Sequence, residues 1–393
     1  MSVVSVPRKP AEVRLEQLPP LSLYVHIPWC IRKCPYCDFN SHESRDEIPE
    51  QRYVDALIAD LEQSLALVWG RRVHSVFFGG GTPSLFSPEA IDRFLSAARA
   101  LLPIDADAEI TLEANPGTFE AGKFAALRAL GINRLSVGIQ SFDPDRLMAI
   151  GRVHDADEAR RAVEIARDTF DNFNLDLMYA LPGQAIGQAL ADVSEAIAAG
   201  APHVSAYHLT IEPNTLFHRH PPPLPDDDVA ADMQIEIEGM LASAGYANYE
   251  TSAFARPGRT CRHNLNYWSF GDYLGIGAGA HGKISLRDRI TRQMKHRHPR
   301  DFMNRALAGD AVQTTHEVPA AELPFEFMLN ALRLTEGFAL QTFVERTGLA
   351  VSSIATRLDQ GEQRGLIERD HLRVWPTAHG RRFLNDLLEL FLA

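Results

Sequence analysis

Cysteine is scarce in this chain, and its scarcity excludes a fold held together by disulfides. Only four of the 393 residues are cysteines. Disulfide-stabilised domains are typically short, secreted and far richer in cysteine. Residues 1–20 mix Arg, Lys, Glu and Pro and contain no apolar segment typical of a secretion signal. We therefore expect a protein of the reducing cytoplasm.

Long apolar runs and an excess of positive charge are also lacking. Asp, Glu or Arg interrupts every apolar run before it reaches the ~20 residues that a membrane-spanning helix needs. The net charge is −12, whereas a nucleic-acid binder carries a basic face. We expect no transmembrane segment and no nucleic-acid partner, which leaves peripheral contact with a membrane open.

Length and composition indicate two or three globular domains. The 393 residues are 45% hydrophobic and 23% charged, which is typical of folded proteins. The proline-rich stretch 221–225, followed by three Asp residues, indicates a stiff linker and then the start of a helix. We predict four segments: a leader arm (1–20), a barrel (21–225), an extension that links it onward (226–320) and a C-terminal domain (321–393).

Three of the cysteines, Cys30, Cys34 and Cys37, lie in one loop directly after an apolar, strand-like run. At C-x3-C-x2-C spacing each thiolate can bind one iron of a 4Fe–4S cluster, which leaves the fourth iron without a protein ligand. A metal with an open position can bind an external chelating group. The alternative is a zinc site of three cysteines and one histidine, with His26 or His42 as the fourth ligand.

Strands and helices alternate over about two hundred residues, which predicts a parallel sheet. The expected strands are 23–27, 73–78, 109–113, 134–139, 174–178 and 204–209. The expected helices are 50–68, one that starts at Pro88 after the N-cap Ser87, 121–130, 155–169 and 185–199. We therefore predict an α/β fold in which six strands form a partial (β/α)6 barrel.

Polar motifs follow the strands at the end where such barrels bind ligands. The cysteine loop follows the first strand, and Gly79, Gly80, Gly81 and Thr82 follow the second. Glu113 and Asn115 come at the end of the third strand, Gln140 follows the fourth, and Asp176 lies on the fifth. We expect all of them to meet at one site.

The C-terminal segment changes pattern. Short helices are expected over 324–334, 340–347, 351–363 and 378–392, with a strand pair near 367–375. This pattern predicts an α+β module of winged-helix type. Its arginines are interleaved with acidic residues, so no basic stripe for DNA results.

Six stretches together resemble the HemN/HemW branch of the radical S-adenosylmethionine (SAM) proteins: YVHIPWCIRKCPYCDF, FFGGGTPS, LEANPG, SVGIQSF, DLMYALPGQ and HNLNYW. The resemblance runs from residue 21 to the C-terminus. It implies a 4Fe–4S cluster on Cys30, Cys34 and Cys37, and SAM chelating the open iron. It also implies an electron donor for the cluster. The SAM-binding positions that it implies are Tyr24, Tyr36, Gly79, Gly80, Gly81, Thr82, Glu113, Gln140, Arg152 and Asp176.

Some of these positions also have structural explanations. Tyr24 is then an ordinary strand residue, the glycine run a tight turn, Glu113 a surface carboxylate and Arg152 a solvated arginine.

Three features place the chain nearer to the HemW type than to the HemN type. Phe39 stands where the HemN pattern has a fourth cysteine, the leader is short, and HNLNYW is similar to a HemW motif. HemN-type proteins are oxygen-independent coproporphyrinogen III dehydrogenases, whereas HemW-type proteins are considered haem chaperones. The resemblance thus implies a haem chaperone that transfers haem to an acceptor protein, with the dehydrogenase as the alternative.

For the haem iron we predict His263 as the axial ligand, because imidazole is a common protein ligand of haem. Tyr267, together with Asn264 and Trp268, is expected to hold the macrocycle. A structural role for His263 and a competing thiolate ligand from Cys261 stay open. The basic stretch 287–300, with Lys295, His296 and His298, is either a solvated loop or a partner for propionates or an acidic protein.

Overall fold

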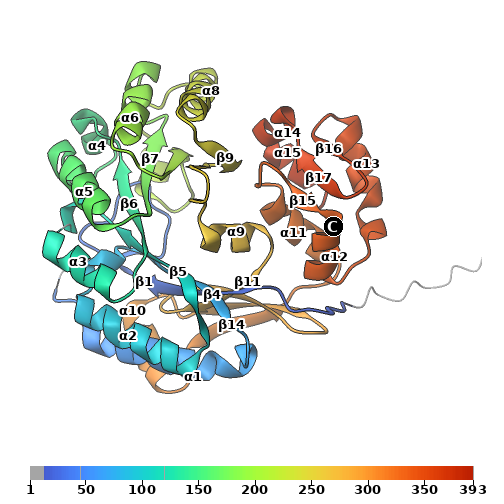
Figure 1. The fold of residues 1–393 in the computed structure, drawn as a ribbon, viewed down its shortest axis with the longest axis horizontal. Coiled ribbons are helices and arrows are strands. Elements are labelled where there is room, and N and C mark those ends of the chain that lie inside the picture. Colours follow the sequence, from blue (N-terminus) through green and yellow to red (C-terminus); the bar gives the residue numbers. More distant parts are fainter. Residues whose placement is uncertain (1–12, 45, 119, 393) are drawn as a thin grey trace, which may run out of the picture.

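A large open sheet dominates the computed structural model, which describes residues 13–44, 46–118 and 120–392. In this sheet twelve strands follow the order β14-β13-β12-β11-β1-β4-β5-β6-β7-β8-β10-β9 (Figure 1). Six central strands are parallel neighbours and confirm the predicted α/β fold with a partial barrel. They are β1 (Leu21–Ile27), β4 (Val73–Gly80), β5 (Ile104–Ala114), β6 (Arg134–Gln140), β7 (Phe173–Tyr179) and β8 (His203–His208).

Helices make the crossovers that parallel strands require. They are α1 (Glu50–Val68), α2 (Pro88–Leu101), α3 (Ala121–Ala129), α4 (Pro144–Ala149), α5 (Ala156–Thr169) and α6 (Ile186–Ala198). The side chain of Ser87 accepts a hydrogen bond from the N–H of Ala90 (3.2 Å), and Asp155 forms a capping box with Glu158. These caps satisfy N–H groups that have no partner inside the helix, so the sequence marks both helix starts.

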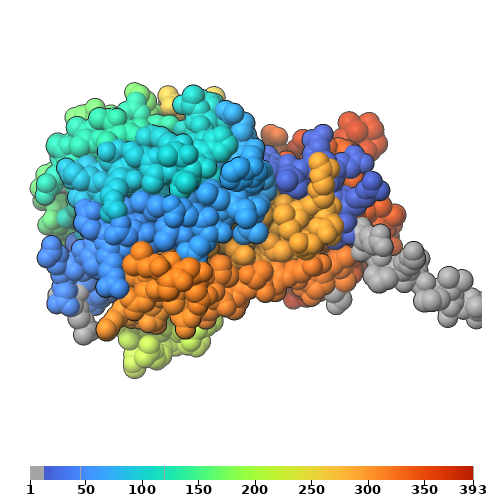
Figure 2. All heavy atoms as spheres, turned by 90° about the horizontal axis from the view of Figure 1, so that it is seen from below, coloured from blue at the N-terminus to red at the C-terminus, as the bar shows by residue number. Residues whose placement is uncertain are grey.

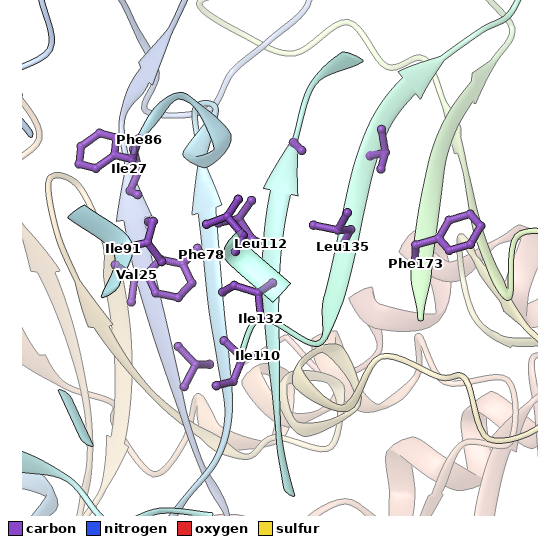
Figure 3. Packing of buried hydrophobic residues seen from close by; sticks show 14 of the residues in the cluster. Val25, Ile27, Phe78, Phe86, Ile91, Ile110, Leu112, Ile132, Leu135 and Phe173 are labelled. Atoms are coloured by element: carbon purple, nitrogen blue, oxygen red, sulfur yellow. The ribbon is translucent and has the colours of Figure 1, made fainter. Parts of the chain in front are cut away.

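The two faces of the central strands differ in chemistry. One face is apolar and packs under the helices, as Figure 3 shows for Val25, Phe78, Leu112 and Leu135. Side chains in a strand alternate between faces, so the intervening residues point into the barrel. These inward residues are mostly polar and line a cavity: Tyr24, Glu113, Arg134, Ser136, Asn174, Asp176 and Ser205. The apolar face supplies the core, and the polar face supplies the site.

Residues 226–320 extend the sheet at both edges, which the sequence did not indicate. Strand β11 (Asp272–Ile276) pairs in parallel with β1, and β12 (His281–Ser285), β13 (Ile290–Lys295) and β14 (Val312–Glu317) follow antiparallel. At the other edge β10 (Ala253–Ala255) pairs with β8, and β9 (Ala247–Glu250) pairs with β10. The short helix α7 (Leu216–Arg219) precedes this segment. The helices within it are α8 (Asp227–Ser243), α9 (Arg262–Trp268) and α10 (Pro299–Leu307), and α10 packs against α1 (Figures 1 and 2).

The basic stretch 287–300 is not a solvated loop, because β13 runs through it. Lys295 is buried, and its Nζ lies 2.5 Å from Asp60 Oδ1 on α1. A buried cation needs such a partner, so Lys295 is unavailable to propionates or to another protein. The expectations of a solvated loop over 287–300 and of a ligand-binding role for Lys295 are therefore wrong.

The C-terminal residues form a separate core, as expected for an α+β module. It contains α11 (Leu323–Ala331), β15 (Phe338–Ala339), α12 (Leu340–Thr347), α13 (Ala355–Gln363), β16 (Ile367–Arg369), β17 (Arg373–Pro376), α14 (Ala378–Arg382) and α15 (Leu384–Glu389). Two predicted helices are wrong in extent. The one over 351–363 is a 3₁₀ turn (Val351–Ser353) followed by α13, which starts only at Ala355. The last one breaks at Phe383, and α15 after the break buries Leu387.

The leader arm lies only partly within the described residues, since 1–12 fall outside them. Leu15 is buried in the C-terminal core, and its N–H donates to the carbonyl of Arg287 (2.9 Å). The described part of the arm therefore joins the C-terminal module to the sheet extension. Across the described ranges, no helix has both the length and the apolar character needed to cross a membrane.

Candidate functional site

A cavity of about 900 Å³ opens at the carboxyl ends of the parallel strands, as barrel geometry predicts. The cysteine loop forms one wall, and α9 contributes His263, Asn264, Tyr267 and Trp268. The structure brings nearly all predicted site residues to this cavity: Tyr24, Cys30, Cys34, Tyr36, Cys37, Gly80, Gly81, Thr82, Glu113, Gln140, Arg152, Asp176, His263 and Tyr267. Gly79 is the exception and does not line it.

Each of the three loop thiols has a hydrogen-bonding neighbour. Thr82 Oγ1 lies 3.6 Å from the Sγ of Cys30, Arg152 Nη1 lies 3.6 Å from that of Cys34, and Ser41 Oγ lies 3.6 Å from that of Cys37. Burial raises the pKa of Cys30 and of Cys37. These thiols therefore release protons when a metal binds, and donors beside a thiolate sulfur orient it and tune a cluster.

Two of these neighbours are joined by Asn115. Its Nδ2 donates to Thr82 Oγ1 (2.7 Å), and its Oδ1 accepts from Arg152 Nη2 (2.6 Å). A continuous chain of hydrogen bonds thus runs from Cys30 to Cys34. Arg152 is held inside this chain rather than solvated, so its structural explanation from the sequence is wrong. Asn115 lies directly after the third predicted strand, where the sequence already places a polar residue, but its bonds to Thr82 and Arg152 are not evident from the sequence.

The zinc alternative does not fit the geometry. His26 uses both ring nitrogens inside the protein: Nδ1 bonds the hydroxyl of Tyr24 (3.0 Å), and Nε2 bonds the carbonyl of Asn40 (2.9 Å). Among the described residues, no three His, Cys, Asp or Glu side chains are grouped to hold a metal ion, with His42 or otherwise. Thiols that each bind a different iron of a cluster do not need that grouping.

The loop is fixed from the opposite side by a segment far along the chain. Asn40 Nδ2 donates to the carbonyls of Ala278 and Arg297, at 2.9 Å each. Gly279 has φ +73, and a Cβ there would lie 2.3 Å from Asn40 Nδ2. The glycine-rich run 275–280 thus receives the cysteine loop. We call this contact the Asn40 clamp.

The glycines at the end of β4 and directly after it also serve close packing. A Cβ on Gly80, which has φ +114, would lie 2.4 Å from the ring of His26, and one on Gly81 would lie 2.5 Å from the carbonyl of Trp29. The N–H of Gly80 donates to Glu113 Oε2 (3.1 Å), and that of Gly81 donates to the carbonyl of Ile27 (2.8 Å). Both N–H groups thus have protein partners, and contact of the carbonyls with SAM stays a prediction. The loop itself closes through β2 (Trp29–Cys30) and β3 (His42–Glu43).

Two carboxyl groups lie deep in the cavity. Burial and the nearby Asp176 raise the pKa of Glu113 to about 8, so Glu113 is protonated at neutral pH. Burial also raises the pKa of Asp176, against hydrogen bonds from Ser136 (2.9 Å) and Asn174 (2.8 Å). Glu113 is not a surface carboxylate, and it attracts a cation only once it has lost its proton.

The other predicted residues line the same wall or the strand ends. Burial raises the pKa of Tyr36, whose ring lies 6.5 Å from that of Phe217. Gln140 ends β6 with φ +69, a backbone conformation that is rare outside glycine and is concentrated at functional sites.

Helix α9 sets its histidine deep in the barrel. The N–H of His263 donates to Glu109 Oε1 (3.1 Å), and its Nδ1 lies 3.2 Å from Ser75 Oγ. No described residue bonds Nε2, which is the free ring nitrogen. Cys261 does not line the cavity, and burial raises the pKa of its thiol to about 12, so it is a poor candidate for a thiolate ligand.

The fold and the site define a radical SAM protein that carries a HemN-type C-terminal module. A model of the radical SAM superfamily matches residues 24–193, and a model of the HemN C-terminal domain matches residues 318–383. The heme chaperone HemW of Escherichia coli K12 is 50% identical over 96% of this chain and 99% of its own length. The heme chaperone HemW of Haemophilus influenzae is 48% identical over 96% of this chain and 99% of its own length. The chain belongs to the HemW family.

A more distant relative and a solved structure agree with this assignment. The heme chaperone HemW of Bacillus subtilis 168 is 34% identical over 94% of this chain and 99% of its own length. The structure of coproporphyrinogen III oxidase (HemN) from Escherichia coli has a TM-score of 0.81 at 23% identity, and the match covers 95% of this chain and 90% of that one. At that identity the likeness shows the shared fold.

Radical SAM proteins carry a 4Fe–4S cluster and SAM. Cys30, Cys34 and Cys37 are the thiols available to the cluster, and Glu113 and Asp176 are the carboxylates available to a cationic ligand. When bound, the cluster and SAM supply reductive cleavage of the sulfonium bond. This chain's residues orient the thiols through Thr82, Asn115 and Arg152.

The Asn40 clamp gives a first prediction. Asn40→Asp removes the amide donor and sets a carboxylate against two carbonyls, so we expect a chelator to strip the cluster about tenfold faster. Loss of the cluster's visible absorbance under anaerobic conditions measures the rate. Asn304→Asp is the matched control, since Asn304 is exposed and only its Oδ1 is bonded, by Arg52. Equal rates in all three proteins would show that the clamp does not hold the loop.

Glu113 gives a second prediction, on pH. Because its pKa is about 8, raising the pH toward that value converts the neutral acid into a carboxylate, which attracts the SAM cation. SAM affinity should therefore rise between about pH 6.5 and about pH 8. Glu113→Gln should bind SAM about tenfold more weakly at the upper end and lose this rise. Calorimetric titration of the reconstituted protein measures both.

Glu212→Gln is the control for this titration, because Glu212 also borders the cavity. If Glu113→Gln keeps the wild-type affinity and pH dependence, Glu113 does not contact SAM.

Proposed function

We propose that this protein is a haem chaperone of the cytoplasm, which binds haem in the barrel cavity and transfers it to an acceptor protein. The full-length likeness to proteins named heme chaperone HemW supports this proposal. The observation that carries it is His263 on α9, whose Nδ1 is held by Ser75 and whose Nε2 is free within the cavity lining. A histidine that is fixed through one ring nitrogen is oriented to bind a metal through the other.

The protonation state of His263 suits this role. Burial, followed by the charge of Arg134, lowers the pKa of His263 to about 3. The imidazole is therefore neutral at physiological pH, and neutral imidazole is the form that binds iron. Protonation does not compete with the metal above about pH 4.

Aromatic residues of α9 are suited to the macrocycle. Tyr267 and Trp268 border the cavity, with their ring centroids 5.0 Å apart. Tyr267 also lies 4.8 Å from the ring of Tyr273, and the guanidinium of Arg333 lies 4.4 Å from the ring of Trp268. These contacts fix the rings in place, so that each ring offers an apolar face or edge to a porphyrin.

The second candidate function is coproporphyrinogen III dehydrogenation. The intact set of cluster and SAM residues around one cavity favours it, since a pure carrier has no evident need for them. Phe39 opposes it: this side chain is 61% exposed in the cysteine loop, at the position of the fourth HemN-type cysteine.

One assay separates the two functions. Anaerobically reconstituted protein is supplied with SAM, a reductant and coproporphyrinogen III, and porphyrin products are followed by chromatography. We expect no product, whether Phe39 is native or replaced by Cys. Turnover to protoporphyrinogen by the native protein would overturn the chaperone proposal.

The proposal also includes an electron donor that reduces the cluster, and it leaves room for peripheral contact with a membrane.

A further inference from the structure

Arg134 is a fully buried arginine that none of the predicted functions uses. It is the first residue of β6, is 2% exposed and is the largest of the fully buried side chains of the described chain. Residues 134, 136 and 138 of this strand point to the barrel interior, and all three border the cavity. Arg134 therefore combines deep burial with access to the ligand space.

The guanidinium of Arg134 lacks hydrogen-bond partners. Its Nε is sealed from solvent and has none, and no described residue bonds its terminal nitrogens. Buried donors that stay unpaired cost free energy, so the great majority are paired in native proteins. Since Arg134 borders the cavity, its two terminal NH₂ groups are the donors that remain available there.

The neighbouring acids attract Arg134 without bonding it. Glu109 Oε1 accepts from the N–H of His263 (3.1 Å) and from the thiol of Cys261 (3.5 Å). The two oxygens of Asp176 accept from Ser136 and from Asn174. Both carboxylates lie near enough to act on Arg134 electrostatically, which keeps a cation in the interior. Because Glu109 and Asp176 are hydrogen-bonded to these other groups, the terminal N–H groups of Arg134 remain without a hydrogen-bond acceptor.

We propose that Arg134 is a binding residue for the carboxylate of a ligand in the cavity. A guanidinium presents two parallel N–H groups that match the two oxygens of a carboxylate, and such pairs are short and strong. Haem carries two such groups on its propionates, and SAM carries one at its amino acid end, which is open to Arg134 only in a SAM molecule that does not chelate the cluster's open iron. That Arg134 binds a haem propionate rests on the proposed function, whereas that it binds the carboxylate of SAM does not.

The test compares each ligand with a form that lacks the carboxylate. Affinities for SAM and decarboxylated SAM, and for haem and haem dimethyl ester, are measured on anaerobically reconstituted wild type and Arg134→Lys. Lysine keeps the charge that balances Glu109 and Asp176 but loses the two-pronged geometry. Arg262→Lys, in which an exposed arginine of α9 changes outside the cavity, is the control.

We expect Arg134→Lys to weaken binding of one carboxylate ligand by about tenfold or more, with little effect on its carboxylate-free form. Such a loss with SAM identifies the amino acid carboxylate, and such a loss with haem identifies a propionate. Unchanged affinity for both ligands would overturn the proposal, as would equal losses with and without the carboxylate. If the wild-type protein binds no haem, the proposed chaperone function fails. The comparison of SAM with decarboxylated SAM then decides alone whether Arg134 binds a carboxylate.

Discussion

Cys34→Ser protein should emerge from anaerobic reconstitution without its 4Fe–4S cluster and without measurable SAM binding. On the proposed assignment the thiolates of Cys30, Cys34 and Cys37 hold the cluster, and a serine oxygen is too hard a ligand to replace one of them. Cys34 is also the thiol that Arg152 contacts, at 3.6 Å, so this change breaks the chain of hydrogen bonds that ends there. SAM affinity falls with the cluster because an open iron is the expected anchor of its amino acid end. Iron and sulfide analysis and visible absorbance measure the first loss, and calorimetry measures the second.

Cys261→Ala supplies the control for this experiment. Cys261 is buried away from the cavity and interacts with Glu109, so its removal should leave the iron content unchanged. A Cys34→Ser protein that retains a full cluster would contradict the assignment of the three loop thiols.

His263→Ala should separate haem binding from the cluster. We expect haem affinity to fall by more than about a hundredfold, because even changes in outer-shell partners cost 10–100-fold in metal affinity. The cluster should persist, since His263 contacts Ser75 and Glu109 rather than the cysteine loop. Haem titration followed by the Soret band gives the affinity, and iron analysis before haem addition gives the cluster content.

His281→Ala is the matched control for that variant. His281 also borders the cavity but is exposed and lies on β12, so its loss should leave haem affinity within about twofold. Unchanged haem uptake by His263→Ala would remove His263 from the site. Loss of haem and cluster together would mean that His263 supports the fold rather than the iron.

The sequence predicts the barrel and the cluster loop because both depend on local signals. Strand β1 is an apolar run that ends before Pro28, and β4 is one that ends in glycines. The caps Ser87 and Asp155 mark the starts of the helices α2 and α5. The C-x3-C-x2-C spacing is likewise a property of eight consecutive residues. Glu113 is singled out by its place at the end of one strand and Asp176 by its place on another, and a parallel sheet brings both to one cavity.

The sequence does not predict contacts between distant segments. Strand β11 joins β1 across about 250 residues of chain, and its pairing leaves no local pattern beyond a glycine-rich run. Asn40 is an ordinary loop residue until the fold sets it against Ala278, and the sequence does not show that Asn115 bonds Arg152. Lys295 resembles a surface lysine in the sequence, and only Asp60 on α1 explains its burial.

The domain boundaries stay a prediction, since the sheet crosses the expected limit near residue 225 without interruption. A limit at that point would cut β9 and β10 from β8, with which they form one edge of the sheet. The C-terminal core likewise recruits Leu15, Phe270 and Ile290 from other segments. Limited proteolysis of the whole chain would show which of these limits the folded protein respects.

The most direct test of the proposed function is a haem titration of the wild-type protein with its cluster in place. Hemin is added stepwise under anaerobic conditions, and the Soret absorbance is followed until it saturates. The proposal predicts saturation at one haem per chain, and the haem should remain bound through gel filtration. A Soret absorbance that rises without saturation, or haem that separates from the protein on the column, would contradict the chaperone function.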